Sequence, residues 1–226
     1  MTLSDDERDG VFDIDEELVP VRELKQAGVM EVDFEGLLKT PLRLEEDLKK
    51  GCGGMLWPAG MVMAKYLIRQ DKDLFKDKTV VLESNWVLEV VWSVLAVALG
   101  FQLDHPLHLT DQIPMLGLMQ RNIALNNLQD QVKASIYDWG ESVPEGIPQR
   151  PDVILAAECV YFEPAFPLLQ QTMKDLIGPN TICYFCFKKR RRADMNFVKV
   201  MKKMFMVEPV EDDPDKPTWS RENLHL

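Results

Sequence analysis

The feature that most constrains the fold is an alternation of short apolar runs and longer amphipathic stretches between residues 79 and 205. The runs have the length of buried strands, and apolar residues recur at helical spacing in the stretches between or after them. We expect strands at TVVLE (79–83), LHLTD (107–111), VKASIYDW (132–139), DVILAAE (152–158) and TICYFCF (181–187). This alternation predicts an α/β, Rossmann-like fold with a mostly parallel sheet and helices on both faces. In such sheets, ligands bind at the carboxyl ends of the strands.

The N-terminal part of the chain has a different pattern. Residues 1–30 are acidic and aperiodic, which predicts a flexible arm, so the folded domain is expected to span 31–226. The stretch EVDFEGLLKTPLRLEED (31–47) alternates apolar and polar residues on both sides of a polar break, as in a β-hairpin. The stretch AGMVMAKYLIRQ (59–70) has roughly helical spacing, and Pro58 suits a helix start.

The composition narrows the possible partners. The formal net charge is −11 at pH 7, so nucleic acid and anionic membranes would be repelled. The longest apolar run, Val87–Leu99, is shorter than the ~20 residues of a bilayer span, and the acidic start MTLSDDERDG is unlike a signal peptide. We therefore expect a cytoplasmic monomer whose partner is a protein or a small molecule, with neither membrane nor nucleic acid bound.

The four cysteines are few and irregularly spaced, which suits a reducing compartment. Cys183 and Cys186 have the spacing of a metal or redox pair, but both lie in a predicted strand, where their side chains would point to opposite faces. No second pair completes four ligands, so we expect no metal site.

Polar and aromatic residues follow several of the predicted strands. Asp111 closes the second strand, where an acid can bind a ribose or can instead cap the next helix. Trp139 follows the third strand and could stack on an adenine, although a tryptophan is more often a core residue. Glu158 comes directly after an apolar strand, and Tyr161 follows three residues later. A carboxylate at that position is unfavourable if buried and unpaired, so we expect Glu158 to be functional.

In this order, these motifs resemble the seven-β-strand protein-lysine methyltransferases, which use S-adenosylmethionine. The resemblance extends from Cys52 to Leu226. Within the family, it is greatest to the fungal enzymes that methylate translation elongation factor 1-alpha. The motifs that carry it are GCGGMLWPAGMVMAKYL (51–67), VVLE (80–83), LTD (109–111), YDWG (137–140), LAAECVYFEPAFPLL (155–169) and FKKRRRADMNF (187–197).

The resemblance implies a fold, a cofactor and a set of site residues. The fold would be a seven-stranded Rossmann-like methyltransferase sheet with an N-terminal hairpin, and the protein substrate would be elongation factor 1-alpha. Glu158 would orient the lysine amine and Tyr161 would form an aromatic wall beside it. The residues implied to line S-adenosylmethionine are Trp57, Glu83, Asp111, Trp139 and Ala157.

The chain departs from the family after VVLE and at its end. Where the family has a glycine loop beside the cofactor, this chain has Ser84, Asn85 and Trp86, which cannot supply the backbone freedom of glycine. One explanation is a local error in the reading frame. Codons can be chosen for Asn85–Leu95 such that the same bases, read two positions later, encode LGAGSGLVGL, which resembles the family's glycine loop. The alternative is a cofactor-free protein-binding module with the same fold. The chain also ends at ENLHL, where the family continues through a last strand, so we expect an incomplete sheet edge.

A basic run, Lys188–Arg192, follows the fifth predicted strand. Such a run is often an exposed, solvated loop. It could also contact an acidic face of the substrate protein or act as a short nuclear signal. The sequence leaves these interpretations open.

Overall fold

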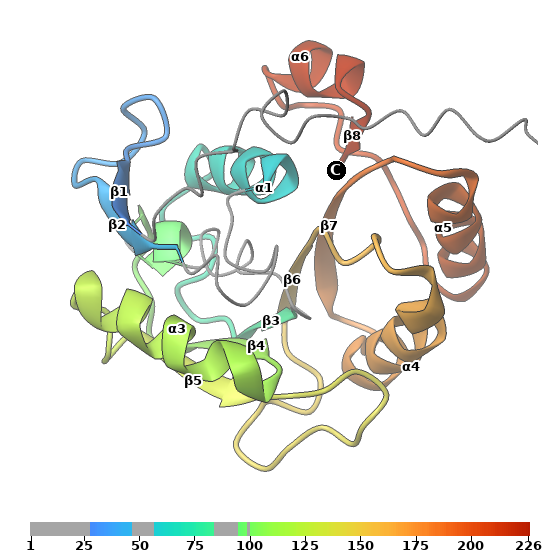
Figure 1. The fold of residues 1–226 in the computed structure, drawn as a ribbon, viewed down its shortest axis with the longest axis horizontal. Helices are drawn as coiled ribbons and strands as arrows, with labels where there is room; N and C mark the ends of the chain where they lie inside the picture. Colours follow the sequence, from blue (N-terminus) through green and yellow to red (C-terminus); the bar gives the residue numbers. More distant parts are fainter. Residues whose placement is uncertain (1–27, 47–56, 84–94, 99) are drawn as a thin grey trace, which may run out of the picture.

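The computed structural model describes residues 28–46, 57–83, 95–98 and 100–226. Its centre is a six-stranded sheet with the strand order β5-β4-β3-β6-β7-β8 (Figure 1). The strands from β3 to β7 are parallel, and β8 runs antiparallel to β7. This arrangement confirms the expected α/β fold. The strands are β3 (Val80–Glu83), β4 (Leu107–Asp111), β5 (Val132–Ile136), β6 (Val153–Ala157), β7 (Ile182–Lys188) and β8 (Leu224–His225).

The main sheet has six strands in the described part of the chain, where seven were expected. The residues after the fifth parallel strand explain the difference. The Val210 N–H donates to the Leu226 carbonyl at 3.0 Å, so the chain at Val210 lies beside the end of β8. Within the described residues, this bond is not continued into a strand ladder beside β8. The last strand, β8, is present but only two residues long.

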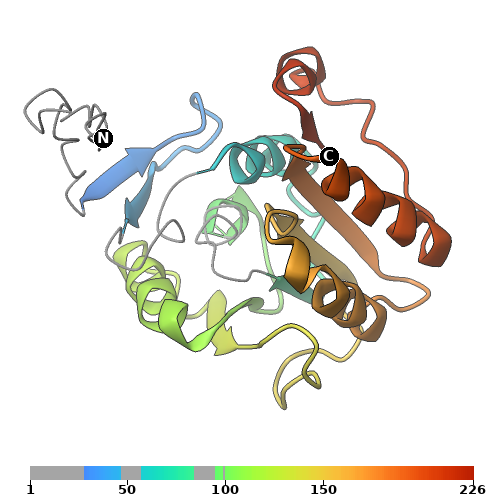
Figure 2. The ribbon, with the colours of Figure 1, turned by 45° about the vertical axis from the view of Figure 1, so that its right-hand side comes forward.

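Helices cover both faces of the sheet, as expected. One face packs against α1 (Pro58–Ile68), α3 (Ile113–Leu125) and the helical residues 95–98, and the other against α4 (Phe166–Leu176) and α5 (Arg192–Met204). Figure 2 shows α4 and α5 together on one side and α3 on the other. Short helices η4 (Glu163–Ala165) and α6 (Lys216–Arg221) precede α4 and β8. None of the described helices is long and apolar enough to cross a membrane.

The predicted hairpin forms from β1 (Val29–Val32) and β2 (Leu42–Glu45), which pair antiparallel. Two asparagines one helical turn apart, Asn122 on α3 and Asn126 at its C-cap, bind the backbone of β2. Asn122 accepts from the Glu45 N–H at 2.7 Å and donates to its carbonyl at 3.1 Å. Asn126 does the same with Arg43, at 2.8 and 2.6 Å. These side chains occupy the hydrogen-bonding groups of an edge strand and fix the hairpin against α3.

The side chains of β7 alternate between the faces, as its sequence predicts. Cys186 is buried in the cluster that includes α1, whereas Cys183 packs against the clusters on the opposite face. Within the described residues, no group of three or more His, Cys, Asp or Glu side chains is arranged to hold a metal ion.

Candidate functional site

Three of the predicted cofactor residues end neighbouring parallel strands. Glu83 ends β3, Asp111 ends β4 and Ala157 ends β6. Strand β3 pairs with both of the others, with Glu83 opposite Thr110 on one side and Ala156 on the other. The strand order therefore brings the three positions to one edge of the sheet, where ligands bind in folds of this class.

Asp111 is fully buried at the end of β4. Its Oδ1 accepts a hydrogen bond from the Gln112 N–H at 2.7 Å. The N-cap of α3 is Gln112, so Asp111 is not the capping residue that the sequence allowed it to be. Its carboxylate instead lies at the mouth of the parallel sheet, one residue before the helix.

Trp139 lies in the core, with 5% of its surface exposed. It packs in the cluster that includes Ala156 and Phe166, between the sheet and α4. The next residue, Gly140, has φ +84 and donates its N–H to the Thr172 hydroxyl at 2.9 Å, which fixes this turn to α4. The indole Nε1 is buried and has no hydrogen-bond partner among the described residues. Trp139 thus has the core environment that the sequence offered as one of two interpretations.

Glu158 combines burial with a rare backbone conformation. It is 2% exposed, and its φ of 52 lies in the left-handed region. A residue other than glycine in that region costs about 1 kcal/mol or more and occurs often at functional sites. The conformation is held from β7, because the Glu158 N–H donates to the Cys186 carbonyl at 2.8 Å.

Arg190 connects Glu158 with Trp57. Its Nη1 donates to Glu158 Oε2 at 2.7 Å, and its guanidinium carbon lies 5.2 Å from the centre of the Trp57 ring. Burial raises the pKa of Glu158. The Arg190 side chain opposes this shift, and the backbone N–H groups of Lys188 and Ala59 do so to a smaller extent. The carboxylate therefore depends on Arg190 for its charged form.

The basic run was expected to be an exposed loop or a partner contact, and for Arg190 and Arg191 that expectation is incomplete. Both backbone N–H groups donate to Asp194 Oδ2 at 2.8 Å, and Asp194 is fully buried. Arg191 also donates to the carbonyl of Tyr161. The run thus binds the segment after β6 that carries both predicted catalytic residues. Sequence reasoning missed Arg190, although its place after a parallel strand was a usable signal.

The segment after β6 presents Tyr161 at the surface. Tyr161 is half-buried, and Phe162 beside it is 57% exposed. The chain therefore passes from the buried Glu158 to the exposed Phe162 within five residues. An acid and an aromatic side chain therefore lie at the boundary between the sheet edge and solvent.

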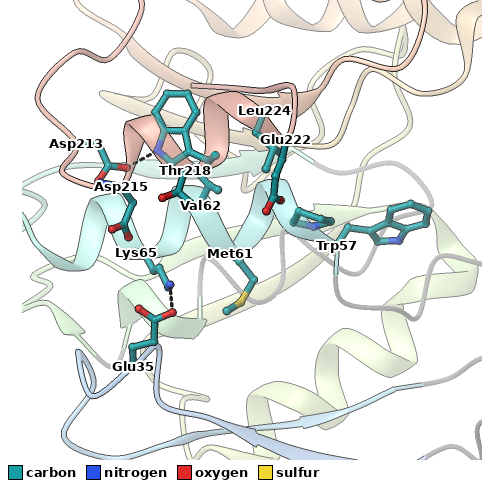
Figure 3. A pocket seen from close by; sticks show the side chains of 12 residues that line it. Glu35, Trp57, Met61, Val62, Lys65, Asp213, Asp215, Thr218, Glu222 and Leu224 are labelled. Carbon is teal, nitrogen blue, oxygen red and sulfur yellow. Dashed lines mark hydrogen bonds and ion pairs between the residues drawn. The ribbon is translucent and has the colours of Figure 1, made fainter.

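A pocket of about 530 Å³ lies between α1 and α6 (Figure 3). Trp57 stands at one end of it, and Glu35 at the other end pairs with Lys65. The remaining lining residues come mostly from α1 and from the chain around α6: Pro58, Met61, Val62, Asp213, Asp215, Thr218, Trp219, Glu222 and Leu224. Four of the lining residues are carboxylates and one is a lysine. Lys65 pairs with Glu35 and Arg69 pairs with Asp213 and Asp215, so the carboxylates still outnumber the cations beside them and the pocket favours cationic groups.

The wall of this pocket is held by Asp213, which is 4% exposed. Its Oδ1 accepts from Arg69 at 3.0 Å and its Oδ2 from the Trp219 indole at 2.9 Å. Nearby, Tyr66 donates to Asp212 at 3.3 Å, and burial with this neighbouring acid raises the pKa of Tyr66 to about 12. These bonds join α1 to the α6 segment, so the pocket is part of the folded frame.

Comparison with known proteins assigns this arrangement to a family. The model of the lysine methyltransferase family matches residues 37–204. The chain belongs to this family. The methyltransferase is 33% identical to "Protein-lysine N-methyltransferase EFM6" of Saccharomyces cerevisiae, over 93% of this chain and 94% of that protein. It is 31% identical to "EEF1A lysine methyltransferase 3" of Xenopus tropicalis, over 74% of this chain and 72% of that protein.

The fold agrees with this assignment. A branched-chain polyamine synthase from Thermus thermophilus aligns with a TM-score of 0.50 at 13% identity, over 68% of this chain and 43% of that one, which is a likeness of fold alone. The expected α/β methyltransferase fold is confirmed, and the chain is an S-adenosylmethionine-dependent protein-lysine N-methyltransferase.

The residues at the sheet edge fit this cofactor. Asp111 places a carboxylate at the end of β4, where it suits the hydroxyl groups of a ribose, and Ala157 places a small side chain at the end of β6. The Trp139 Nε1 is a buried donor without a partner in the described part of the chain. The departure from the family's glycine loop falls on residues 84–94, which lie outside the described residues. The cofactor-free alternative depends on the same segment.

Proposed function

We propose that this methyltransferase modifies a lysine of translation elongation factor 1-alpha. The name of the Xenopus relative supports this substrate, as does the resemblance of the segment after β6 to the fungal enzymes. The observation that carries the proposed chemistry is the buried, left-handed Glu158 at the carboxyl end of the sheet, paired with Arg190 at 2.7 Å.

When bound, S-adenosylmethionine supplies an electrophilic methyl group on a positively charged sulfur. The chain's own task is to present a neutral amine in line with that methyl group. A free lysine has a pKa of about 10.4, so the amine must lose its proton before it attacks. In this proposal, Glu158 orients the amine by accepting a hydrogen bond, and the face of Tyr161 packs beside the methylated cation.

The proposed cofactor contacts are Trp57, Glu83, Asp111, Trp139 and Ala157. Asp111 would bind the ribose, because a carboxylate at the end of the second strand has that role in folds of this class. Trp139 lies in the core between the sheet and α4, so it would contact the cofactor from the side of the site that faces α4.

The pocket between α1 and α6 is proposed to hold a basic segment of the substrate protein. It adjoins Trp57, which contacts Arg190 and through it Glu158. Its four carboxylates outnumber Lys65 and Arg69, the cations that pair with them, which suits a segment rich in lysine or arginine. Trp57 would then connect the substrate-binding pocket with the catalytic Glu158 through Arg190.

The substrate proposal can be tested by methyl transfer in vitro. Purified elongation factor 1-alpha is incubated with labelled S-adenosylmethionine and the full chain, both as written and with residues 84–95 replaced by LGAGSGLVGL, here called the loop-bearing form. We expect the loop-bearing form to label one lysine, identified by peptide mass spectrometry. Unmodified elongation factor 1-alpha, with other proteins labelled when the same enzyme is added to a cell extract, would reject this substrate and retain the enzyme class.

A further inference from the structure

The two carboxylate oxygens of Glu158 have different surroundings. Oε2 accepts a hydrogen bond from Arg190 Nη1 at 2.7 Å. Oε1 is buried and accepts no hydrogen bond of normal geometry within the described residues, although the backbone N–H groups of Lys188 and Ala59 lower the pKa of the carboxylate. A buried charged oxygen without a full set of hydrogen bonds is unfavourable, so Oε1 is the oxygen of the pair that can accept a further hydrogen bond from a ligand.

Arg190 is held in place at both ends. Its backbone N–H is fixed by the buried Asp194 at 2.8 Å, and its guanidinium lies against the Trp57 ring, with 29% of the side chain exposed. The planar guanidinium can stack on an aromatic ring and bind a carboxylate at the same time, which a lysine ammonium cannot do equally well. The turn after β7 therefore presents a preorganised cation to Glu158.

We propose that Arg190 positions Glu158 for methyl transfer, fixing Oε2 so that Oε1 accepts a hydrogen bond from the target lysine amine. This inference rests on the proposed function, in which Glu158 contacts the amine. Arg190 acts through Glu158 and is a positioning residue. The same guanidinium packs on Trp57, the N-cap of α1, so the position of Trp57 also affects the orientation of Glu158.

The pairing also solves an electrostatic difficulty of the reaction. An unpaired carboxylate beside the target lysine would stabilise the protonated ammonium, which has no lone pair and cannot attack. Arg190 neutralises the charge of Glu158 and leaves its second oxygen as an acceptor. Glu158 can then orient a neutral amine without holding it in its unreactive form.

The kinetic test compares Arg190→Gln and Arg190→Lys with Arg192→Gln, which removes the same charge from an exposed position two residues away. Each variant is made in the full chain in its loop-bearing form. We expect Arg190→Gln to lower kcat about tenfold, with KM for elongation factor 1-alpha and cofactor affinity within about threefold. Arg190→Lys should recover part of the lost kcat, and Arg192→Gln should have the kcat of the parent. If Arg190 acts through Glu158, the double variant Glu158→Gln/Arg190→Gln should be no slower than Glu158→Gln alone.

A second readout needs neither substrate nor cofactor. The side-chain carboxyl of Glu158 is titrated by NMR in the full chain labelled at glutamate carboxyl carbons, with its signal assigned by its absence in Glu158→Gln. Because Arg190 lowers the pKa of Glu158, Arg190→Gln should move the titration to higher pH and Arg192→Gln should not. An unchanged titration in Arg190→Gln would overturn the inference, and so would a shifted titration with unchanged kcat.

A slow Glu158→Gln with a normal Arg190→Gln would reject only this inference, whereas a fully active Glu158→Gln would reject the proposed role of Glu158 itself.

Discussion

At the scale of single residues, the site depends on charged groups that the fold buries. Glu158 is 2% exposed and Asp111 is fully buried, and both follow parallel strands at the same edge of the sheet. Burying a carboxylate is unfavourable unless it is paired or used. Glu158 is additionally held at a positive φ, which side chains other than glycine rarely adopt. Arg190 pairs with Glu158 and the Gln112 N–H donates to Asp111, so both carboxylates are held in place at the edge where ligands bind in folds of this class.

Glu158→Ala in the loop-bearing form should reduce methyl transfer by about tenfold or more, which corresponds to about 1.4 kcal/mol of transition-state stabilisation. Cofactor affinity should change by no more than about threefold, because the acid is proposed to contact the amine. Initial rates and calorimetry measure the two quantities. Glu163→Ala, an exposed acid on η4, serves as the control and should keep full activity. A folded Glu158→Ala protein with normal turnover would exclude Glu158 from the reaction.

Asp111→Ala should weaken S-adenosylmethionine binding by about 1.5 to 3 kcal/mol, the range for hydrogen bonds to a charged group. The physical reason is the loss of the carboxylate acceptor at the end of β4. Calorimetric titration of the loop-bearing form measures the change, with Gln112→Ala as the neighbouring control. A lower melting temperature at unchanged cofactor affinity would instead give Asp111 a purely structural role.

At the scale of elements, the central strands are joined at their start as well as at their carboxyl ends. Asp152, just before β6, accepts from the Thr79 N–H at 2.8 Å and from its hydroxyl at 2.7 Å. The Asp152 N–H returns a bond to the same hydroxyl at 3.0 Å. These bonds fix the register of β3 against β6 at the opposite end from the site.

Asp152→Ala should lower the free energy of unfolding by about 1 to 2 kcal/mol at neutral pH, since the bonds to Thr79 are lost. The Thr79 backbone N–H, followed by its hydroxyl, lowers the pKa of Asp152 below its ordinary 3.8. Its contribution is therefore complete above that value and is lost as the pH falls through the lower folded value. The difference between the two proteins in urea titrations should be complete above 3.8, the ordinary pKa of the carboxyl, and should shrink only as the pH falls below that value. A constant difference down to pH 2 would show that the effect does not involve the ionised carboxylate.

Glu222→Lys tests the pocket between α1 and α6. The reversal should raise KM for elongation factor 1-alpha severalfold and leave cofactor affinity unchanged, because it reduces the negative charge offered to a basic segment. Stability should not fall, since Glu222 is the C-cap of α6 and a cation is favourable at a helix C-terminus. Asp130→Lys, an exposed reversal between α3 and β5, is the matched control. Equal effects of the two reversals would indicate a general charge effect and no specific groove.

The sequence predicted the positions of β3, β4, β6 and β7, because each of these apolar runs is bounded by polar or turn residues, but it extended the third strand to Trp139, whereas β5 ends at Ile136. The hairpin was also predictable from alternation. The pairing of Arg190 with Glu158 was not, since it joins loops after two neighbouring strands and depends on their spatial order. The core position of Trp139 was open for the same reason, because α4 covers it from a distant part of the chain.

At the scale of the whole molecule, an acidic chain with net charge −11 presents a carboxylate-rich pocket beside the candidate site. Family membership fixes the chemistry as lysine methylation with S-adenosylmethionine. The departure from the family lies between β3 and the helical residues 95–98, where the sequence offers Trp86 and Val90 in place of glycines. Glycine allows a close approach of backbone to ligand that residues with a Cβ do not. Cofactor binding is therefore the property most sensitive to this segment.

The most direct test of the account is calorimetric titration of S-adenosylmethionine into the written chain and the loop-bearing form, after circular dichroism shows that both are folded. We expect micromolar binding by the loop-bearing form, weakened by Asp111→Ala, and no measurable binding by the written chain. A folded loop-bearing form that does not bind would contradict the assignment of the cofactor to the edge formed by β3, β4 and β6. Micromolar binding by the written chain would contradict the claim that the glycine loop is indispensable.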